Sequence, residues 1–443
     1  MKKLSRLVQK ALKEFDFLKA ARLLFYTFVF FLPFNINLLV YTTDVFNTGN
    51  FNTYTSFFVY LCDFLFIFAL IFWAVSAFRK QFTEKFTYGN SFLFILLVLF
   101  LILAEISVVF SQEKVISILL LIRLGECLLL YFFTVNKVVT VNTVINVFIA
   151  SVSLQAFLAI LQFLFHGSLG LEFLGESLIS PVTTGVAKID LLNETIVRPY
   201  GTFPHSNLLA GYLVTSIFLT FYRVLNKEHI AFPLLFLQIG ALVLTFSRAA
   251  FIALIIGWLV YISVKNTKIP YKLIFLIVCS LILFVVIFNL EELLLNRVLF
   301  NDMTSLNDRV FYFNISKAML VLMPFGIGLG NFTLMMQDFT FTKLAPWDFQ
   351  PVHNIYLLIA NEIGLPGLII FLSLLIAFGV LIFIKMKKSH NENKRFGVIL
   401  LCILSSYLVI GLFDHYLFSL YQGLMLSFFI FSLSGRYITE ESR

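Results

Sequence analysis

The sequence predicts an all-α integral membrane protein with about 12 transmembrane helices. Hydrophobic residues make up 60% of the 443 residues and charged residues only 13%, whereas soluble globular proteins average about 25% charged residues. Apolar runs of about 20 residues, long enough to cross a bilayer as a helix, recur along the chain. Lys and Arg gather in every second loop between these runs. Helices are expected because a backbone in contact with lipid must satisfy its own hydrogen bonds.

Taken in order, the apolar runs give the predicted spans. The first run follows a basic N-terminal segment and has no small-residue cleavage site after it, which predicts an uncleaved span. The seventh and eighth runs form a tight pair around Ser247 and Arg248, and the tenth is long enough to tilt or to extend past the membrane. The predicted spans are residues 23–40, 55–78, 91–110, 115–133, 143–165, 205–222, 231–247, 249–264, 271–289, 353–384, 398–412 and 415–434.

The basic residues predict that both termini lie in the cytoplasm. Of the 32 Lys and Arg residues, 23 lie in the termini and loops on one side of the predicted bundle, 8 lie on the other side, and Arg123 lies within a span. Loops rich in Lys and Arg stay in the cytoplasm. The formal charge of +8 is therefore a signal of membrane orientation, and it does not indicate a nucleic-acid partner.

Two loops on the predicted outer side are long, at residues 166–204 and 290–352, and function is expected to concentrate there. Within the second loop, residues 309–323 have the apolar spacing of a helix that Pro324 then ends. We expect an amphipathic helix on the outer membrane surface. An alternating glycine turn follows it, which is weak evidence for phosphate binding because it lacks the spacing of a dinucleotide fingerprint. The expected apolar face consists of Phe311, Ile315, Ala318, Met319 and Leu322.

Polar residues in the outer loops are the candidates for chemistry. Each has an ordinary structural alternative, since an arginine can snorkel to lipid headgroups or stay solvated, and a histidine can cap a helix. Arg198 also has Glu194 as a possible ion-pair partner four residues back. As a set they are unusual, because this chain otherwise keeps its positive charge inside. The candidates are Arg198, His205, Asn207, Arg248, Arg309, His353 and Asn354.

The residue types point to a substrate that carries phosphate. The planar guanidinium of arginine donates a fork of hydrogen bonds that fits phosphate oxygens. A histidine close to neutrality can accept the proton of a hydroxyl group. The carboxylates of the large loop are spread out without a DxD pair, so a metal site is not expected, and arginine would stabilise a leaving diphosphate instead. Those carboxylates are Asp302, Asp308, Asp338 and Asp348.

A second group of charged residues falls within the membrane. Asp63, Glu105, Arg123 and Glu126 are expected in the outer halves of spans two to four, with Arg123 and Glu126 three residues apart on one helix. Charges inside a bilayer are costly and often functional. We favour a mutually neutralised structural network, with proton coupling in a transporter as the alternative.

Four stretches carry motifs of a known family. They read RPYGTFPHSNLLAGYL, LTFSRAAFIALIIGWLVY, DRVFYFNISKAMLVLMPFGIGLGNF and HNIYLLIANEIGLPGLIIF. In the last and most specific stretch, His353-Asn354 is followed after nine residues by Gly364-Leu-Pro-Gly367. The chain thereby resembles the O-antigen ligase and polymerase-like family of bacterial membrane glycan transferases. The resemblance is strongest over residues 231–384.

The resemblance implies a metal-independent, inverting transfer with no cofactor. The implied donor is a glycan on undecaprenyl diphosphate, and the acceptor hydroxyl belongs to a sugar, lipid or protein outside the cytoplasm. By position, the family's catalytic arginines map to Arg248 and Arg309 and its histidine to His353. Arg198 matches an arginine often found before span six and would position the donor. Pro204-His205 departs from the more usual Gly-Asn-Pro-Asn pattern, which weakens any role for His205.

The resemblance also organises the chain. Residues 1–230 form a six-span N-terminal region, 231–384 a ligase-like core that includes loop 290–352, and 385–443 a two-span C-terminal region. The expected location is the bacterial cytoplasmic membrane, with the active site outside and a role in cell-envelope polysaccharide such as lipopolysaccharide. A polymerase and a protein O-glycosyltransferase of the same family remain open. A transporter or lipid-glycan flippase is the rival from another class, although no repeats or paired broken helices support it.

Overall fold

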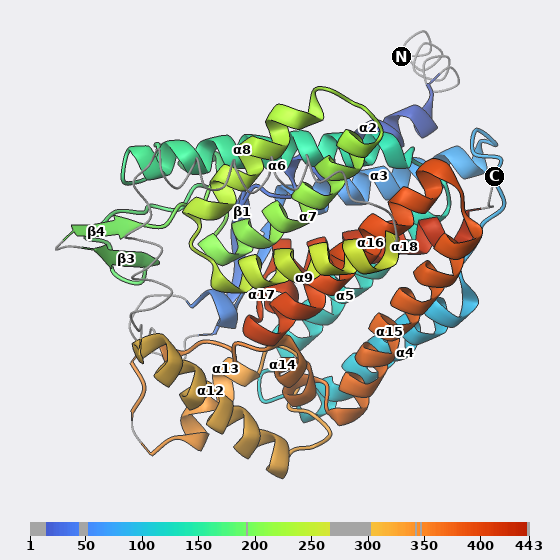
Figure 1. Cartoon of the computed structure of the whole chain (residues 1–443). Coiled ribbons are helices and arrows are strands. Elements are labelled where there is room, and N and C mark those ends of the chain that lie inside the picture. The colour runs from blue at the N-terminus through green and yellow to red at the C-terminus, as the bar shows by residue number, and fades with distance from the viewer. Residues whose placement is uncertain are drawn as a thin grey trace, which may run out of the picture.

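The computed structural model describes residues 15–43, 52–191, 194–265, 303–341, 343–345 and 348–440. The described helices pack side by side as one bundle (Figure 1). Seven helical segments in this part of the chain are long and apolar enough to cross a membrane, which agrees with a multi-pass membrane protein. They are Leu61–Phe78 (α3), Ser91–Phe110 (α4, Ser91–Ser107, with η2, Val108–Phe110), Lys114–Val135 (α5), Val141–Leu164 (α6), Ser206–Leu225 (α7), Leu365–Lys388 (α15) and Asn391–Phe413 (α16).

Two further apolar helices match predicted spans. The predicted seventh and eighth spans are the helices α8, Ala231–Leu244, and α9, Arg248–Lys265. The predicted ninth span, 271–289, lies outside the described residues. The total of 12 spans therefore stays a prediction.

The first predicted span was too long at its C-terminal end, and the second was too long at its N-terminal end. The first helix, α2, covers Phe17–Phe31, and the chain then forms the strand β1, Asn37–Thr42. A short 3-10 turn, η1 (Thr53–Thr55), leads into β2, Ser56–Tyr60, which pairs antiparallel with β1 before α3 begins. Pro33 explains the early end of α2, because proline cannot donate the next helical hydrogen bond. The expectation of helix over residues 37–40 and 56–60 was wrong.

A second hairpin lies in the first long loop. The 3-10 turn η3, Glu172–Leu174, is followed by β3, Lys188–Leu191, and β4, Glu194–Val197, which pair antiparallel. This hairpin projects from the side of the bundle (Figure 1). The chain then passes through residues 198–205 into α7, so the hairpin directly precedes the first candidate stretch.

The predicted tenth span is two helices instead of one. The helix α14, Ile355–Glu362, stops before Gly364, and α15 starts at Leu365 with a proline in its first turn. Gly364 has a φ of +90°, which a residue with a side chain rarely adopts. A Cβ at Gly364 would come within 2.5 Å of the Phe325 carbonyl carbon. The break therefore lets the segment after Pro324 pack closely, and the Leu365 amide donates to the Pro324 carbonyl at 2.9 Å.

The helix predicted from Arg309 is confirmed but starts earlier, as α12, Met303–Leu322. Its buried face carries Tyr312, Ile315 and Met319, which form a separate small core with the short helix α13, Phe332–Met335, the turn η4, Met336–Phe339, and α14. The predicted face was shifted, because Ala318 and Leu322 are exposed. These elements lie together at one end of the bundle, below the long helices in Figure 1.

The C-terminal region closes the bundle. After α16 the chain forms the single turn α17, Tyr416–Ser419, and then α18, Tyr421–Thr439. The predicted twelfth span, 415–434, is thus interrupted at Leu420 and extends to residue 439. The helix α18 packs against α5, and α9 packs against α16, so the three predicted regions share one bundle.

Candidate functional site

Four helix ends meet at one end of the bundle. The start of α7, the turn between α8 and α9, the start of α14 and the end of α16 are joined by hydrogen bonds. Asn207 donates to Asp414 at 2.8 Å, and Arg198 donates through Nε to the Thr245 carbonyl at 2.6 Å. Asn354 donates to the Leu412 carbonyl at 3.2 Å. Residues that are distant in sequence are therefore held together by rigid elements.

Arg198 and Asn207 form the first part of the site. The Arg198 guanidinium is buried and donates through Nη2 to the Asn207 side-chain oxygen at 2.6 Å. The Asn207 amide in turn donates to Oδ2 of Asp414. The candidate stretch before α7 is thus connected to the end of α16 by a chain of hydrogen bonds between side chains.

His353 and Asp414 form the second part. Nδ1 of His353 lies 4.0 Å from Oδ1 of Asp414, which also accepts the His415 backbone N–H at 2.8 Å. The His353 ring lies between two aromatic neighbours, with its centroid 5.6 Å from that of Tyr312 on α12 and 5.1 Å from that of His415. The Tyr54 ring contacts His415 edge-on at 5.3 Å.

Asp414 carries the negative charge of this site. Burial alone would raise the pKa of its carboxyl, but the nearby imidazoles of His353, His415 and His205 hold that pKa well below its usual range. The carboxylate is therefore ionised throughout the physiological range. Hydrogen bonds hold both carboxylate oxygens in place, so the negative charge stays beside the ring of His353.

The candidate arginines Arg248 and Arg309 interact electrostatically. Burial lowers the pKa of Arg309, the carboxylate of Asp414 opposes this shift, and the charge of Arg248 adds to it. Arg309 is half-buried on α12, whereas Arg248 is exposed as the first residue of α9. Since a guanidinium keeps its proton in proteins, Arg309 carries a positive charge within electrostatic range of both Asp414 and Arg248.

Two further candidates cap helices. The His205 ring caps α7 by accepting the Asn207 backbone N–H at 3.1 Å. Burial, followed by the charge of Arg198, lowers the pKa of His205 to about 4, so its ring is neutral near pH 7. Asn354 caps α14 by accepting the backbone N–H groups of Tyr356 and Leu357. The contacts of both residues are those of helix caps that border the site.

Sequence reasoning missed Asp414, His415 and Tyr54. Asp414 and His415 stand in the sequence Phe413-Asp-His-Tyr416 between two apolar runs. An acidic residue in a tight turn between two predicted spans is a usable signal, because a charge at membrane depth needs a partner. Tyr54 lies in the loop between β1 and β2, where the sequence predicted the beginning of a span.

Three side chains of the site also have the composition of a metal site. Ligand atoms of His353, Asp414 and His415 lie within 4.8 Å of one another, and two histidines with a carboxylate suit zinc. The structure gives these groups other partners. Both Asp414 oxygens accept protein N–H groups, and Nδ1 of His415 lies 2.6 Å from the Ser419 hydroxyl. Hydrogen bonds within the protein therefore already account for this arrangement.

The charged group inside the bundle is separate from this site. Arg123 forms ion pairs with Asp63 and with Glu126, the latter at 2.6 Å. Its guanidinium also lies over the Tyr421 ring, 4.5 Å from the centroid, and donates to the Phe58 carbonyl. Glu105 is exposed on α4 instead of joining them. These contacts agree with a structural network.

One known protein family matches part of the chain. Residues 233–372 match the family model described as O-antigen ligase, so the resemblance predicted from the sequence is confirmed. No curated protein matches the chain. The matched segment contains Arg248, Arg309 and His353, while Arg198 and Asp414 lie on either side of it.

Proposed function

We propose that this chain, assigned to an O-antigen ligase-like family by residues 233–372, transfers a glycan from an undecaprenyl-diphosphate carrier to an acceptor hydroxyl. The family match supports a membrane glycan transferase of the O-antigen ligase type in general. The observation that carries the finer proposal is that Asp414 lies 4.0 Å from His353 and acts electrostatically on Arg309, on which the charge of Arg248 also acts.

Arg248 and Arg309 would hold the diphosphate. Their charges act on one another, and a diphosphate placed between them would relieve that repulsion. As the bond from the anomeric carbon to the diphosphate oxygen breaks, negative charge grows on the leaving group. Fixed donors in a site with little water stabilise such charge strongly. This is why we propose a reaction that needs no metal.

His353 would act as the general base. The acceptor oxygen attacks the anomeric carbon, its proton moves to the His353 ring, and the carrier diphosphate leaves with the electron pair of the broken bond. Attack from the face opposite the leaving group inverts the anomeric centre. Asp414 would orient the ring and stabilise the imidazolium that forms, as the acid does in other histidine-based sites.

Arg198 and Asn207 would act through Asp414 and the donor. Asn207, which Arg198 holds by a hydrogen bond, donates to Oδ2 of Asp414, whereas His353 lies nearest Oδ1. We retain Arg198, His205, Asn207 and Asn354 as substrate-binding residues in this proposal. His205 and Asn354 would contribute by placing the helix starts that border the substrate.

The side of the membrane that we propose for the site is based on the distribution of basic residues. The site lies at the end of the bundle opposite the basic loops that include residues 79–90 and 385–397. By the positive-inside rule, those loops face the cytoplasm of a bacterial cell and the site faces outward. A lipid carrier in the outer leaflet would then reach the arginines from the membrane.

The acceptor separates three versions of this activity. A ligase moves a finished glycan to a foreign acceptor, a polymerase joins repeat units on the carrier, and a protein O-glycosyltransferase modifies a side chain. The surface glycan of a deletion strain distinguishes the first two. Accumulation of carrier-linked polymer without attached glycan indicates a ligase, whereas single-unit products indicate a polymerase.

The direct test is transfer in vitro from a carrier-linked donor by purified protein, normalised to the monodisperse fraction. Transfer should depend on His353 and Arg309. A transporter would instead depend on the Arg123 network and remain active after His353→Ala. In cells, normal surface glycan with His353→Ala together with its loss in Arg123→Ala would favour transport.

A further inference from the structure

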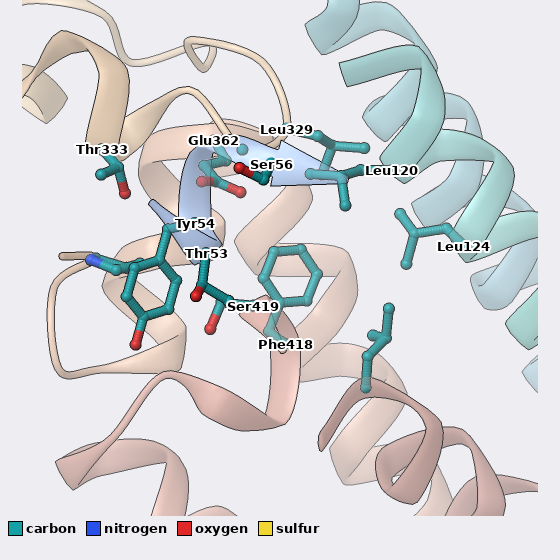
Figure 2. Close-up of a pocket in the computed structure, with 13 residues that line it drawn as sticks. Thr53, Tyr54, Ser56, Leu120, Leu124, Leu329, Thr333, Glu362, Phe418 and Ser419 are labelled. Atoms are coloured by element: carbon teal, nitrogen blue, oxygen red, sulfur yellow. The ribbon is translucent and has the colours of Figure 1, made fainter. Parts of the chain in front are cut away.

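A cavity lies directly beside the site, between the loop before β2, α5, the glycine turn and α17 (Figure 2). Its empty volume is about 550 Å³ including its mouth. The site described above does not use it. Its lining residues are Thr53, Tyr54, Ser56, Leu120, Leu124, Leu329, Gly330, Thr333, Pro351, Glu362, Phe418, Ser419 and Leu424.

One wall of this cavity is shared with the candidate site. The Ser419 hydroxyl lies 2.6 Å from Nδ1 of His415, and the Tyr54 ring contacts the ring of the same histidine. His415 in turn packs against His353. The His415 side chain therefore contacts both the wall of the cavity and the proposed general base.

The opposite wall carries a buried carboxyl group. Glu362, the last residue of α14, is only 5% exposed. Figure 2 shows its carboxyl beside Ser56, with the rings of Tyr54 and Phe418 below it in this view. The backbone amides of Gly330 and Phe332 act on the Glu362 carboxyl and lower its pKa, which partly offsets the effect of burial. A carboxyl group has about four acceptor positions, so Glu362 has acceptor capacity for a ligand.

Burial raises the pKa of Glu362 to about 8. The residue belongs to α14, outside the candidate spans. Near neutral pH much of the group therefore holds a proton, and it can donate one hydrogen bond as well as accept others. A polar group of this kind in a partly apolar wall matches a ligand that has both donors and acceptors.

The lining excludes other ligand classes. A phosphate or a carboxylate would be repelled by Glu362 whenever it ionises, and none of the described residues that line the cavity is basic. A lipid tail would offer no hydrogen-bond partner to the buried carboxyl group of Glu362, which costs free energy. A pyranose ring has apolar faces for Tyr54 and Phe418 and a rim of hydroxyls for the polar groups.

We propose that this cavity binds a sugar residue of the acceptor and thereby places the neighbouring acceptor hydroxyl at His353. The inference rests on the proposed function and adds the acceptor class, a carbohydrate, to it. A second cavity, with an empty volume of about 430 Å³ including its open mouth, shares Thr53, Ser56 and Ser419 with the first and extends to Arg123. An acceptor of more than one sugar would extend in that direction.

The test uses the full chain in lipid nanodiscs without glycoside detergent. The probes are the methyl glycosides of glucose, galactose and N-acetylglucosamine, with cyclohexanol as a ring of similar size that has one hydroxyl. Saturation-transfer NMR measures binding without requiring turnover. We expect at least one glycoside to bind to the wild-type protein and cyclohexanol to bind more weakly.

Two variants probe opposite sides of the cavity. Glu362→Met removes the polar atoms, and Thr53→Trp fills the mouth from an exposed position. Each should weaken glycoside binding about tenfold or more, as expected for the loss of a hydrogen bond to a buried group or of the space itself. Glu362→Gln keeps an acceptor and a donor, so it should lie between Glu362→Met and the wild type. Asp338→Asn, at an exposed position in η4, should bind like the wild type.

The possible results separate the two proposals. Absence of glycoside binding to the wild type, equal binding of cyclohexanol, or unchanged binding in both Glu362→Met and Thr53→Trp overturns the acceptor pocket. Binding of undecaprenyl diphosphate in the same nanodiscs reports on the arginines instead. Glycoside binding that depends on Glu362 in a protein that neither binds undecaprenyl diphosphate nor transfers glycan would refute the proposed function and leave the sugar pocket in place.

Discussion

Replacing Asp414 with asparagine should slow transfer while leaving the diphosphate in place. The side chain keeps its shape and can still accept one hydrogen bond, but the negative charge beside His353 disappears. In the transition state His353 gains a positive charge, which Asp414 stabilises in the wild type from 4.0 Å. In the variant this stabilisation is lost, and the barrier to transfer rises.

The magnitude follows from the geometry. Two unit charges about 4 Å apart interact by about 4 kcal/mol at an effective dielectric constant of about 20. The Asp414 side chain is 7% exposed and that of His353 25%, so water weakens the interaction from the His353 side. Taking about 3–4 kcal/mol and about 1.4 kcal/mol for each factor of ten, we expect turnover to fall by about 10²–10³.

The assay needs a readout that misfolding would not reproduce. Because Asp414 lies near Arg309, removing its charge should leave the binding of undecaprenyl diphosphate unchanged or make it tighter. Transfer from a carrier-linked donor gives turnover, and binding to vesicles containing the carrier gives affinity. Asp338→Asn, at an exposed carboxylate in η4, serves as the control that removes a charge elsewhere. Turnover within about threefold of the wild type, or a parallel loss of carrier binding, would refute the role assigned to Asp414.

Three further predictions test the site and its setting. Arg309→Lys keeps the charge but loses the planar fork, and we expect the two single variants Arg309→Lys and His353→Ala each to reduce turnover by about 10² or more. Because the residues act as a unit, turnover of the double variant Arg309→Ala with His353→Ala should be little lower than that of the slower single variant. Additive losses in a kinetic series would contradict this. Activity should persist in excess chelator, and activity that EDTA abolishes and zinc restores would instead assign His353, Asp414 and His415 to a metal. A cysteine at Val182 in the first long loop should react with an impermeant thiol reagent in intact cells and one at Lys394 should not, whereas the reverse pattern would invert the orientation.

The long helices were predictable because their signal is local. An apolar run of about 20 residues has few alternatives to a membrane helix, and α4, α5 and α6 follow the predicted ranges within a few residues. The helix around Arg309 was also predictable, from apolar spacing and a following proline. Its orientation was not, because the residues that cover its buried face come from α13 and α14.

The strands and the break in the tenth span were missed for a different reason. Short apolar segments such as residues 37–42 do not distinguish a strand from the end of a helix by periodicity. Gly364 and the proline after it were interpreted as a family motif, although their backbone preferences also end a helix. The packing of the segment after Pro324 against this break is a long-range contact, and no local pattern indicates it.

The matched family segment does not contain the whole site. Arg248, Arg309 and His353 fall within residues 233–372, but the carboxylate that faces His353 comes from the end of α16, and Asn207, which fixes that carboxylate, comes from the start of α7. Asn207 and Asp414 are 207 positions apart in the chain, so only the folded bundle brings them together. A general base that is oriented by a group outside the motif can carry out the same reaction in related proteins while the residues that line the neighbouring cavity differ. The segment within the family match would then preserve transfer from the carrier, whereas the cavity formed mainly by residues outside it, such as Tyr54 and Ser419, would determine which acceptor is used.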